Sequence, residues 1–255
     1  MYFNYISGEN ITDAWIEAIK YLFENSRETF NLMVQIENPL CLRDDIKDEY
    51  EKICNDYNLL NIRQVSYTIF PDTLYKRIAR ENADILYKKY FKWFHRFKRK
   101  GDWGTYFHRM ISKPCFNSKN NKMIDLNQLK EIISLLKIRE RVYKTPYFIS
   151  ISDPIKDLKR TMGGPCLNYI ALQLDKNKDG ENTINLVAFY RNHNFLERAF
   201  GNYVGLGQLL NFLCNECDYK LGYLTCISSH AYISVDKRGV SHNVIKVLKR
   251  LVDRL

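Results

Sequence analysis

Most of the side chains that could do chemistry in this chain lie between Gly163 and Tyr232. Cys166 follows a Gly-Gly-Pro turn at the edge of an apolar run, and Arg191 closes a later apolar run. A cysteine attacks as its thiolate, and a free thiol with a pKa of about 8.5 is mostly protonated at neutral pH. A neighbouring cation lowers that pKa. If the two runs are consecutive antiparallel strands, they bring Arg191 close to Cys166, and the pair becomes a candidate for covalent catalysis.

Four more polar or aromatic residues follow in a definite order. Asn194 lies three positions after Arg191, Asn202 lies eight positions after Asn194, and His230-x-Tyr232 closes the stretch. This order resembles the thymidylate synthase family, which includes the pyrimidine-nucleotide hydroxymethylases. That family has Pro-Cys at its nucleophile, then Arg, an acidic residue three positions later, Asn eight positions after that, and finally His-x-Tyr.

The resemblance implies a reaction at carbon 5 of a pyrimidine nucleotide. In the family the cysteine adds to carbon 6, and carbon 5 then attacks a one-carbon donor. Cys166 is therefore the expected nucleophile of a methyl or hydroxymethyl transfer from 5,10-methylenetetrahydrofolate. The resemblance assigns Arg191 to the nucleotide phosphate, and His230 and Tyr232 to the sugar hydroxyl. Asn202 is expected to read the base, because its amide offers the donor and acceptor that match O4 and N3–H of uracil.

Cytosine-directed members of the family carry an acidic residue at the position of Asn202, so we expect a uridine-type monophosphate as substrate. Arg27 lies in a short turn between a helix and a strand, where the family binds phosphate, although a solvated turn residue fits the sequence equally well. Tyr106 resembles the tyrosine that lines the family's active site. Asn194 replaces the family's acidic residue and can hydrogen-bond but cannot act as a base, and Leu167 replaces a histidine.

Three departures separate the sequence from the family. The family's catalytic Glu has no counterpart in an apolar context among residues 40–72. Thr145-Pro146 stands where two arginines of the family's homodimer reach the partner's phosphate; the candidates to replace them are Arg139, Arg141 and Lys144. The sequence ends at Leu255 without the tail that closes over the folate, and a missing lid weakens the exclusion of water. A nucleotide-binding or regulatory homologue without folate chemistry is therefore the alternative, and a homodimer is expected by resemblance alone.

The composition is that of an ordinary globular chain, with 45% hydrophobic and 27% charged residues. No run approaches the roughly 20 apolar residues of a membrane helix, and no secretory signal is found, so we expect no membrane partner and a cytoplasmic location. Seven cysteines without small-domain spacing favour a reducing compartment. Cys214-x-x-Cys217 lies in a helical pattern that favours packing over zinc, and no metal is expected.

The formal charge of +10 favours a polyanionic partner. Basic residues alternate with aromatic ones from Leu86 to Lys100, a pattern that fits a nucleic-acid surface but also any amphipathic helix with a solvated face. We favour the amphipathic helix. A basic module that binds nucleic acid remains the third alternative.

The pattern of helices and strands predicts a single α+β domain over residues 1–255, with a mixed or antiparallel sheet packed with long helices. The resemblance implies that this domain is thymidylate synthase-like. Residues 176–180 carry a strong hairpin signal. The expected helices begin at Thr12-Asp13, at Leu86, after a cap at Asp125, at about Tyr203 and at residue 241; the expected strands are 30–36, 147–152, 168–175, 183–190 and 221–227.

Overall fold

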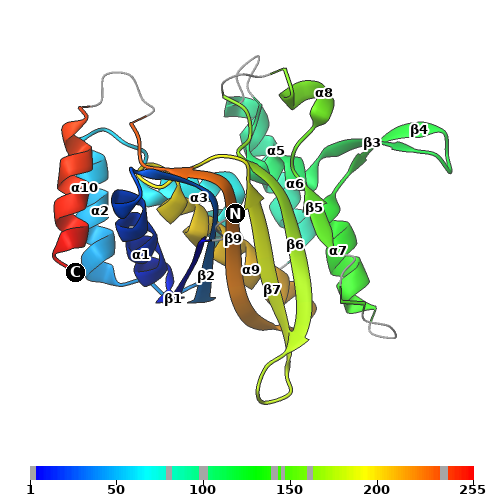
Figure 1. The fold of residues 1–255 in the computed structure, drawn as a ribbon. Helices are drawn as coiled ribbons and strands as arrows, with labels where there is room; N and C mark the ends of the chain where they lie inside the picture. Colours follow the sequence, from blue (N-terminus) through cyan, green and yellow to red (C-terminus); the bar gives the residue numbers. More distant parts are fainter. Residues whose placement is uncertain are drawn as a thin grey trace.

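The computed structural model describes residues 4–78, 82–97, 103–138, 143–144, 147–159, 163–235 and 241–255. A mixed sheet runs through the middle of this structure, in the strand order β1-β2-β9-β7-β6-β5, with the short β8 paired to β9 (Figure 1). Its strands are β1 (Asn4–Asn10), β2 (Glu28–Asn38), β5 (Phe148–Ser150), β6 (Leu167–Lys176), β7 (Asn182–Tyr190), β8 (His193–Asn194) and β9 (Lys220–Tyr232). A separate hairpin consists of β3 (Lys113–Asn117) and β4 (Lys122–Leu126).

The helices of the described residues gather mainly on one side of the sheet (Figure 1). They are α1 (Ile11–Glu24), α2 (Asp44–Asp56), α3 (Ile62–Ile69), α4 (Asp72–Arg77), α5 (Ala83–Phe97), α6 (Tyr106–Ile111), α7 (Gln128–Lys137), α8 (Pro154–Asp157), α9 (Ala199–Cys217) and α10 (Asn243–Asp253). The described chain is therefore a mixed α+β structure, as the sequence predicts.

The two faces of the sheet differ in what they contact. On the helix side, Val34, Cys226, Ala188 and Ile170 stand opposite one another across four neighbouring strands, and all four are fully buried. Successive side chains of a strand point to opposite faces, so the intervening residues form the other side of the sheet.

That other side is open. Tyr5, Met33, Ile227, Phe189 and Tyr169 form a continuous row in register across β1, β2, β9, β7 and β6. The exposed fractions of Tyr5, Tyr169 and Phe189 are 53%, 42% and 38%. An apolar row of this kind on a sheet face is typical of a docking surface.

Helix α9 is buried on nearly all sides because it lies between the sheet and α3. Two glycines on its surface allow this close contact. A Cβ on Gly201 would lie 2.5 Å from the Cβ of Val65, and one on Gly205 would lie 2.8 Å from the carbonyl oxygen of Ser66. The helix ends at Asp218, whose φ of 59° places it in the left-handed region.

Several sequence predictions of single elements are confirmed, including the hairpin between β6 and β7 and a helix over residues 86–97. Two are wrong. Asp125 does not cap a helix: it lies in β4 and accepts a hydrogen bond from Ser112, while Asn127 caps α7. Helix α9 begins at Ala199 and not near Tyr203, so Asn202 lies inside its first turn.

Part of the sequence prediction falls outside the described residues, namely Arg139, Arg141, Thr145-Pro146 and the basic residues 98–100. Lys144 is described and exposed. Within the ranges that the structure describes, no helix is long and apolar enough to cross a membrane.

Candidate active site at one end of the sheet

The predicted site residues lie at the end of the sheet where β6 and β2 begin and β7 and β9 end, opposite the turn 177–181 (Figure 1). Because β6 and β7 are antiparallel neighbours, Cys166 and Arg191 flank the same step of the ladder. The Arg191 N–H donates to the Cys166 carbonyl at 2.9 Å, and its Nε donates to the Pro165 carbonyl at 3.1 Å. The expected approach of these two segments is confirmed.

Tyr106 adds a third group beside Cys166. It opens α6 after the N-cap Thr105, and its side chain is buried. Its hydroxyl accepts a hydrogen bond from the Cys166 N–H at 3.2 Å and a longer one from the Leu167 N–H. Burial, with a smaller effect of Cys166, raises the pKa of Tyr106 to about 12, so the phenol keeps its proton at neutral pH. Tyr106 can therefore hold the Cys166 backbone and still donate one hydrogen bond.

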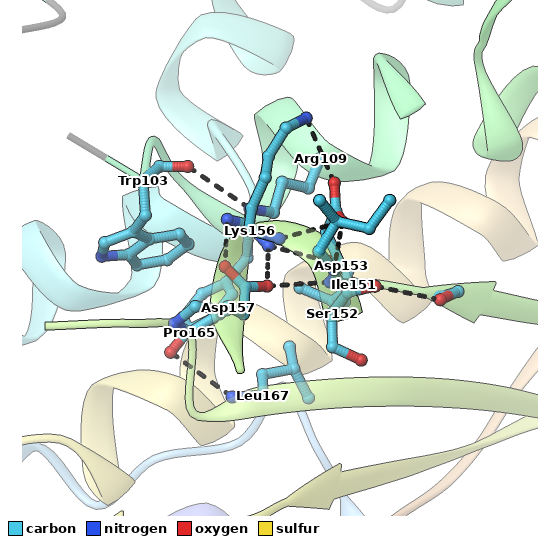
Figure 2. A network of polar contacts seen from close by, with 12 residues as sticks. Trp103, Arg109, Ile151, Ser152, Asp153, Lys156, Asp157, Pro165 and Leu167 are labelled. Atoms are coloured by element: carbon cyan, nitrogen blue, oxygen red, sulfur yellow. Dashed lines mark hydrogen bonds and ion pairs between the residues drawn. The ribbon is translucent and has the colours of Figure 1, made fainter. Parts of the chain in front are cut away.

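A buried ion pair fixes the segment that carries Tyr106 (Figure 2). The Arg109 guanidinium forms a bidentate pair with Asp157, in which Nη2 lies 2.9 Å from Oδ1. It also donates to the carbonyls of Trp103 and Ile151, and it lies 5.4 Å from the Trp103 ring centroid. The Trp103 ring in turn packs at 4.9 Å against Tyr106. The pair thus ties α6 to the segment between β5 and β6.

Asn202 belongs to a buried chain of three side chains. Its Nδ2 lies 3.1 Å from Nε2 of His193, whose Nδ1 lies 2.9 Å from the Ser228 hydroxyl. Burial lowers the pKa of His193 to about 3, so the ring is neutral. Since the amide is a donor, Nε2 must accept and Nδ1 must carry the proton that goes to Ser228. This chain sets the orientation of the Asn202 amide and leaves its Oδ1 without a partner among the described residues.

His230 and Tyr232 form a second cluster on the same face of β9. Their rings stack at 5.1 Å with an interplanar angle of 10°, as expected for residues two apart on a strand. Asn192 binds both: its Oδ1 accepts from Nδ1 of His230 at 2.7 Å, and its Nδ2 lies 3.5 Å from the Tyr232 hydroxyl. Arg27 lies at this end of the sheet too, because its carbonyl accepts from the N–H of Ile233 at 2.9 Å, and its side chain is exposed.

Asn194 has both side-chain groups engaged with the backbone. Its Oδ1 accepts from the N–H groups of Leu196 and Glu197, and its Nδ2 donates to the carbonyl of Ser234 at 2.9 Å. These bonds hold the turn between β8 and α9. Its catalytic role stays a prediction.

Three consecutive residues, 191–193, connect the Cys166 segment, the His230 cluster and Asn202. Arg191 binds the Cys166 segment, Asn192 binds the His230 cluster, and His193 binds Asn202. Behind them, the Tyr190 ring stacks on His193 at a centroid distance of 4.0 Å. The site is therefore built around one short segment that leaves the end of β7.

Sequence reasoning missed Arg198, the residue that caps α9. Its N–H donates to the Asn194 carbonyl at 3.0 Å. Burial raises the pKa of Tyr106 overall, and the positive charge of Arg198 acts to lower it. Arg198 lies four positions before Asn202, and residues four apart share one side of a helix. That spacing was the available signal. The partners of Asn202, His193 and Ser228, had no comparable signal because their burial depends on the tertiary fold.

The described residues hold no group of three or more side chains arranged to bind a metal ion. Cys214 and Cys217 are buried in α9, and burial raises the pKa of their thiols to about 12 and about 11. No protein-family model matches the chain, and no curated protein matches it.

Proposed function

We propose that this chain is a thymidylate synthase-like enzyme that transfers a one-carbon unit, as methyl or hydroxymethyl, to carbon 5 of a uridine-type nucleoside monophosphate. One observation carries the proposal: the segment 191–193 hydrogen-bonds to the backbone of Cys166, to Asn202 through His193, and to His230 and Tyr232. These bonds hold together, at one end of the sheet, the groups that the reaction needs: the thiol of Cys166, the guanidinium of Arg191, the amide of Asn202, and the proposed sugar ligands His230 and Tyr232.

The covalent steps begin and end at Cys166. Its thiolate adds to carbon 6 of the pyrimidine, forming the C–S bond and moving the ring's electron pair toward carbon 5 and O4. A guanidinium near the thiol favours the thiolate, and both Arg191 and Arg198 lie at this end of the sheet. After transfer, the proton of carbon 5 leaves to a base or to water, the electron pair returns to the ring, and the C–S bond breaks to release the thiolate. The methyl product would also need a hydride from the reduced folate, whereas the hydroxymethyl product would need a water molecule in its place.

The remaining site residues bind the nucleotide. Arg191 and Arg27 are the proposed phosphate ligands. Asn202 pairs with the uracil edge through its free Oδ1 and its second N–H, because His193 occupies only one amide hydrogen. His230 and Tyr232 hold the sugar. The buried phenol of Tyr106 donates its hydrogen toward the site.

The one-carbon unit would come from 5,10-methylenetetrahydrofolate. No contact among the described residues of the site identifies a folate-binding surface, so we derive only the steps that the chain's own residues perform. The second candidate is a homologue that binds the nucleotide without transferring carbon. Asn194 favours it, because an amide cannot act as a base and both of its side-chain groups hydrogen-bond to the backbone.

We propose a homodimer that packs through the open sheet face. The row from Tyr5 to Tyr169 is apolar, lies on the side away from the helices, and runs across five strands. All seven cysteines are free thiols, which supports the proposed cytoplasmic location.

Calorimetric titration with dUMP and dCMP tests the proposed base recognition. The native chain is expected to bind dUMP at least roughly ten-fold more tightly than dCMP, since a mismatched base leaves buried polar groups unpaired. Asn202→Asp is expected to reverse the preference. Asn215→Asp adds the same charge at an exposed position of the same helix and serves as the control.

Binding of neither nucleotide contradicts the proposal. Binding of dUMP without any product in the presence of the folate supports the second candidate. Product formation, read as the added mass of the nucleotide, supports the transferase and distinguishes methyl from hydroxymethyl transfer.

A further inference from the structure

A cavity lies between α3, α4 and α5. Its volume is about 620 Å³, within the usual range of ligand sites. None of the candidate active-site residues lines it. The lining residues that carry charge or an aromatic ring are Arg63, Tyr67, Arg77, Lys89 and Trp93.

The charge of this cavity is positive. Arg63, Arg77 and Lys89 are exposed, and none of them forms an ion pair within the described part of the chain. No Asp or Glu is among the lining residues. Arg63 and Arg77 line the cavity together with Tyr67. Burial raises the pKa of Tyr67, and the positive charges of these two arginines act in the opposite direction.

The carboxylates on the neighbouring helices are already paired. Asp72 of α4 binds Lys76 at 2.8 Å, and Asp84 of α5 binds Lys130 at 3.0 Å. They therefore do not neutralise the three cations of the cavity.

Two aromatic rings complete the cavity. Tyr67 and Trp93 meet edge to face at 5.2 Å, and Trp93 is 38% exposed. On the buried side of α5, Leu86, Tyr90 and Phe94 pack into the core. Trp93 lies at the edge of that face, because its ring contacts Tyr90 at 5.7 Å and also lines the cavity. A large ring kept at the surface among cations is typical of a platform on which a base stacks.

The basic surface continues beyond the cavity. Lys88, Lys92 and Arg96 are exposed along α5 at intervals of four residues. Four-residue spacing places them on one side of the helix, over about 12 Å of its length. A single nucleotide would occupy the cavity alone, whereas a strand of several nucleotides reaches these further cations as well.

We propose that the α3–α5 cavity and the adjoining face of α5 bind single-stranded nucleic acid. A base stacks on Trp93 and Tyr67, and the backbone phosphates contact Arg63, Arg77 and Lys89. Single strands fit this chemistry because their bases are free to leave the stack and lie on an aromatic ring. The site is independent of the nucleotide site at Cys166.

Fluorescence anisotropy with labelled oligo(dT) and oligo(U) of twelve nucleotides tests the proposal, with a duplex of the same length and dTMP as competitors. The test variant is Arg63→Gln/Arg77→Gln/Lys89→Gln. The control variant Lys119→Gln/Lys122→Gln/Lys178→Gln removes the same charge from exposed positions in or beside two hairpin turns elsewhere. Thermal melting of each variant verifies folding.

Loss of three phosphate contacts is expected to reduce the slope of log K against log salt by about 2, because each contact to a single strand contributes about 0.7. The control variant keeps the native slope. Trp93→Leu is expected to weaken binding roughly ten-fold without changing that slope, since it removes stacking but no charge. Formation of a covalent nucleotide adduct at Cys166 is expected to stay unchanged in all of these variants, so the two sites are tested separately.

Equal weakening in the test and control variants would overturn the proposal, because binding would then follow net charge alone. Competition by dTMP as strong as by the oligonucleotide would also overturn it, since the cavity would then hold a mononucleotide only. Preference for the duplex would contradict the role of the aromatic rings.

Discussion

Protonation of His193 is expected to destabilise the folded chain in mild acid. The ring is 1% exposed, and burial lowers its pKa to about 3 from the usual 6.5. Its Nε2 accepts a hydrogen bond from the amide of Asn202, and its ring stacks on Tyr190. A proton on Nε2 would place two donors against each other inside the core.

The size of the effect follows from the shift. The unfolded chain binds this proton more tightly than the folded chain, so the stabilisation is complete above pH 6.5 and is lost as the pH falls toward 3. A shift of this size corresponds to about 5 kcal/mol in total, at about 1.4 kcal/mol per unit. Between about pH 7.5 and about pH 5, the same linkage removes about 2 kcal/mol, and any folded pKa below about 4 gives nearly the same loss.

Urea unfolding at the two pH values measures this loss in the native chain and in His193→Gln. Glutamine supplies a donor and an acceptor but does not titrate in this range. The native chain is expected to lose about 2 kcal/mol more than the variant on acidification. Equal losses in the two proteins, or a His193 pKa near 6.5 by NMR titration, would refute the reasoning.

Three further predictions concern packing and buried polar groups. Arg109→Met removes the cation that pairs with the largely buried carboxylate of Asp157, which keeps the hydrogen bond from the Asp153 N–H, and is expected to lower the free energy of unfolding by about 3–5 kcal/mol in urea titration. Gly201→Ala is expected to cost about 1–3 kcal/mol by overpacking against Val65, and the double variant with Val65→Ala is expected to recover part of this loss. Tyr203→Phe is expected to leave stability unchanged or to raise it by about 1 kcal/mol in thermal and urea unfolding, because its buried hydroxyl has no partner in the described structure.

Each of these has a matched control. Lys130→Met breaks the exposed ion pair with Asp84 and is expected to lower the free energy of unfolding by less than about 1 kcal/mol. An equally small loss in Arg109→Met would contradict the larger stabilisation expected from the Arg109–Asp157 pair. Additive effects of Gly201→Ala and Val65→Ala would argue against their contact. Tyr50→Phe removes a hydroxyl that donates to the Leu196 carbonyl, so it is expected to destabilise the fold. An equal destabilisation by Tyr203→Phe would contradict the prediction for Tyr203.

The parts of the fold that depend on local pattern could be predicted from the sequence. The pairing of β6 with β7 follows from two apolar runs around a turn, and it alone brings Arg191 to the Cys166 segment. The joint placement of His230 and Tyr232 follows from the two-residue period of a strand. Local rules suffice in these cases because the partners are close in sequence or on one element.

The remaining features depend on tertiary contacts. The sequence predicts a start of α9 near Tyr203, which is too late, because glycine disfavours a helix by itself; here Gly201 lies in the first turn and gives room to the side chain of Val65. The hydrogen bond between Asn202 and His193 cannot be predicted from the sequence, because His193 is a neutral acceptor only when it is buried in the folded core. The exposed position of Trp93 likewise depends on α3 and α4, which leave its ring beside a cavity and not under a covering helix.

The most direct test of the central claim is the intact mass of the protein after incubation with 5-fluoro-dUMP, with and without methylenetetrahydrofolate. We expect a mass increase by the nucleotide, or by nucleotide and folate together, that is absent in Cys166→Ser. Cys41→Ser, which alters the exposed cysteine, is expected to keep the adduct. No adduct under either condition, or an adduct that survives Cys166→Ser, would contradict the claim that the Cys166 sulfur attacks a pyrimidine ring.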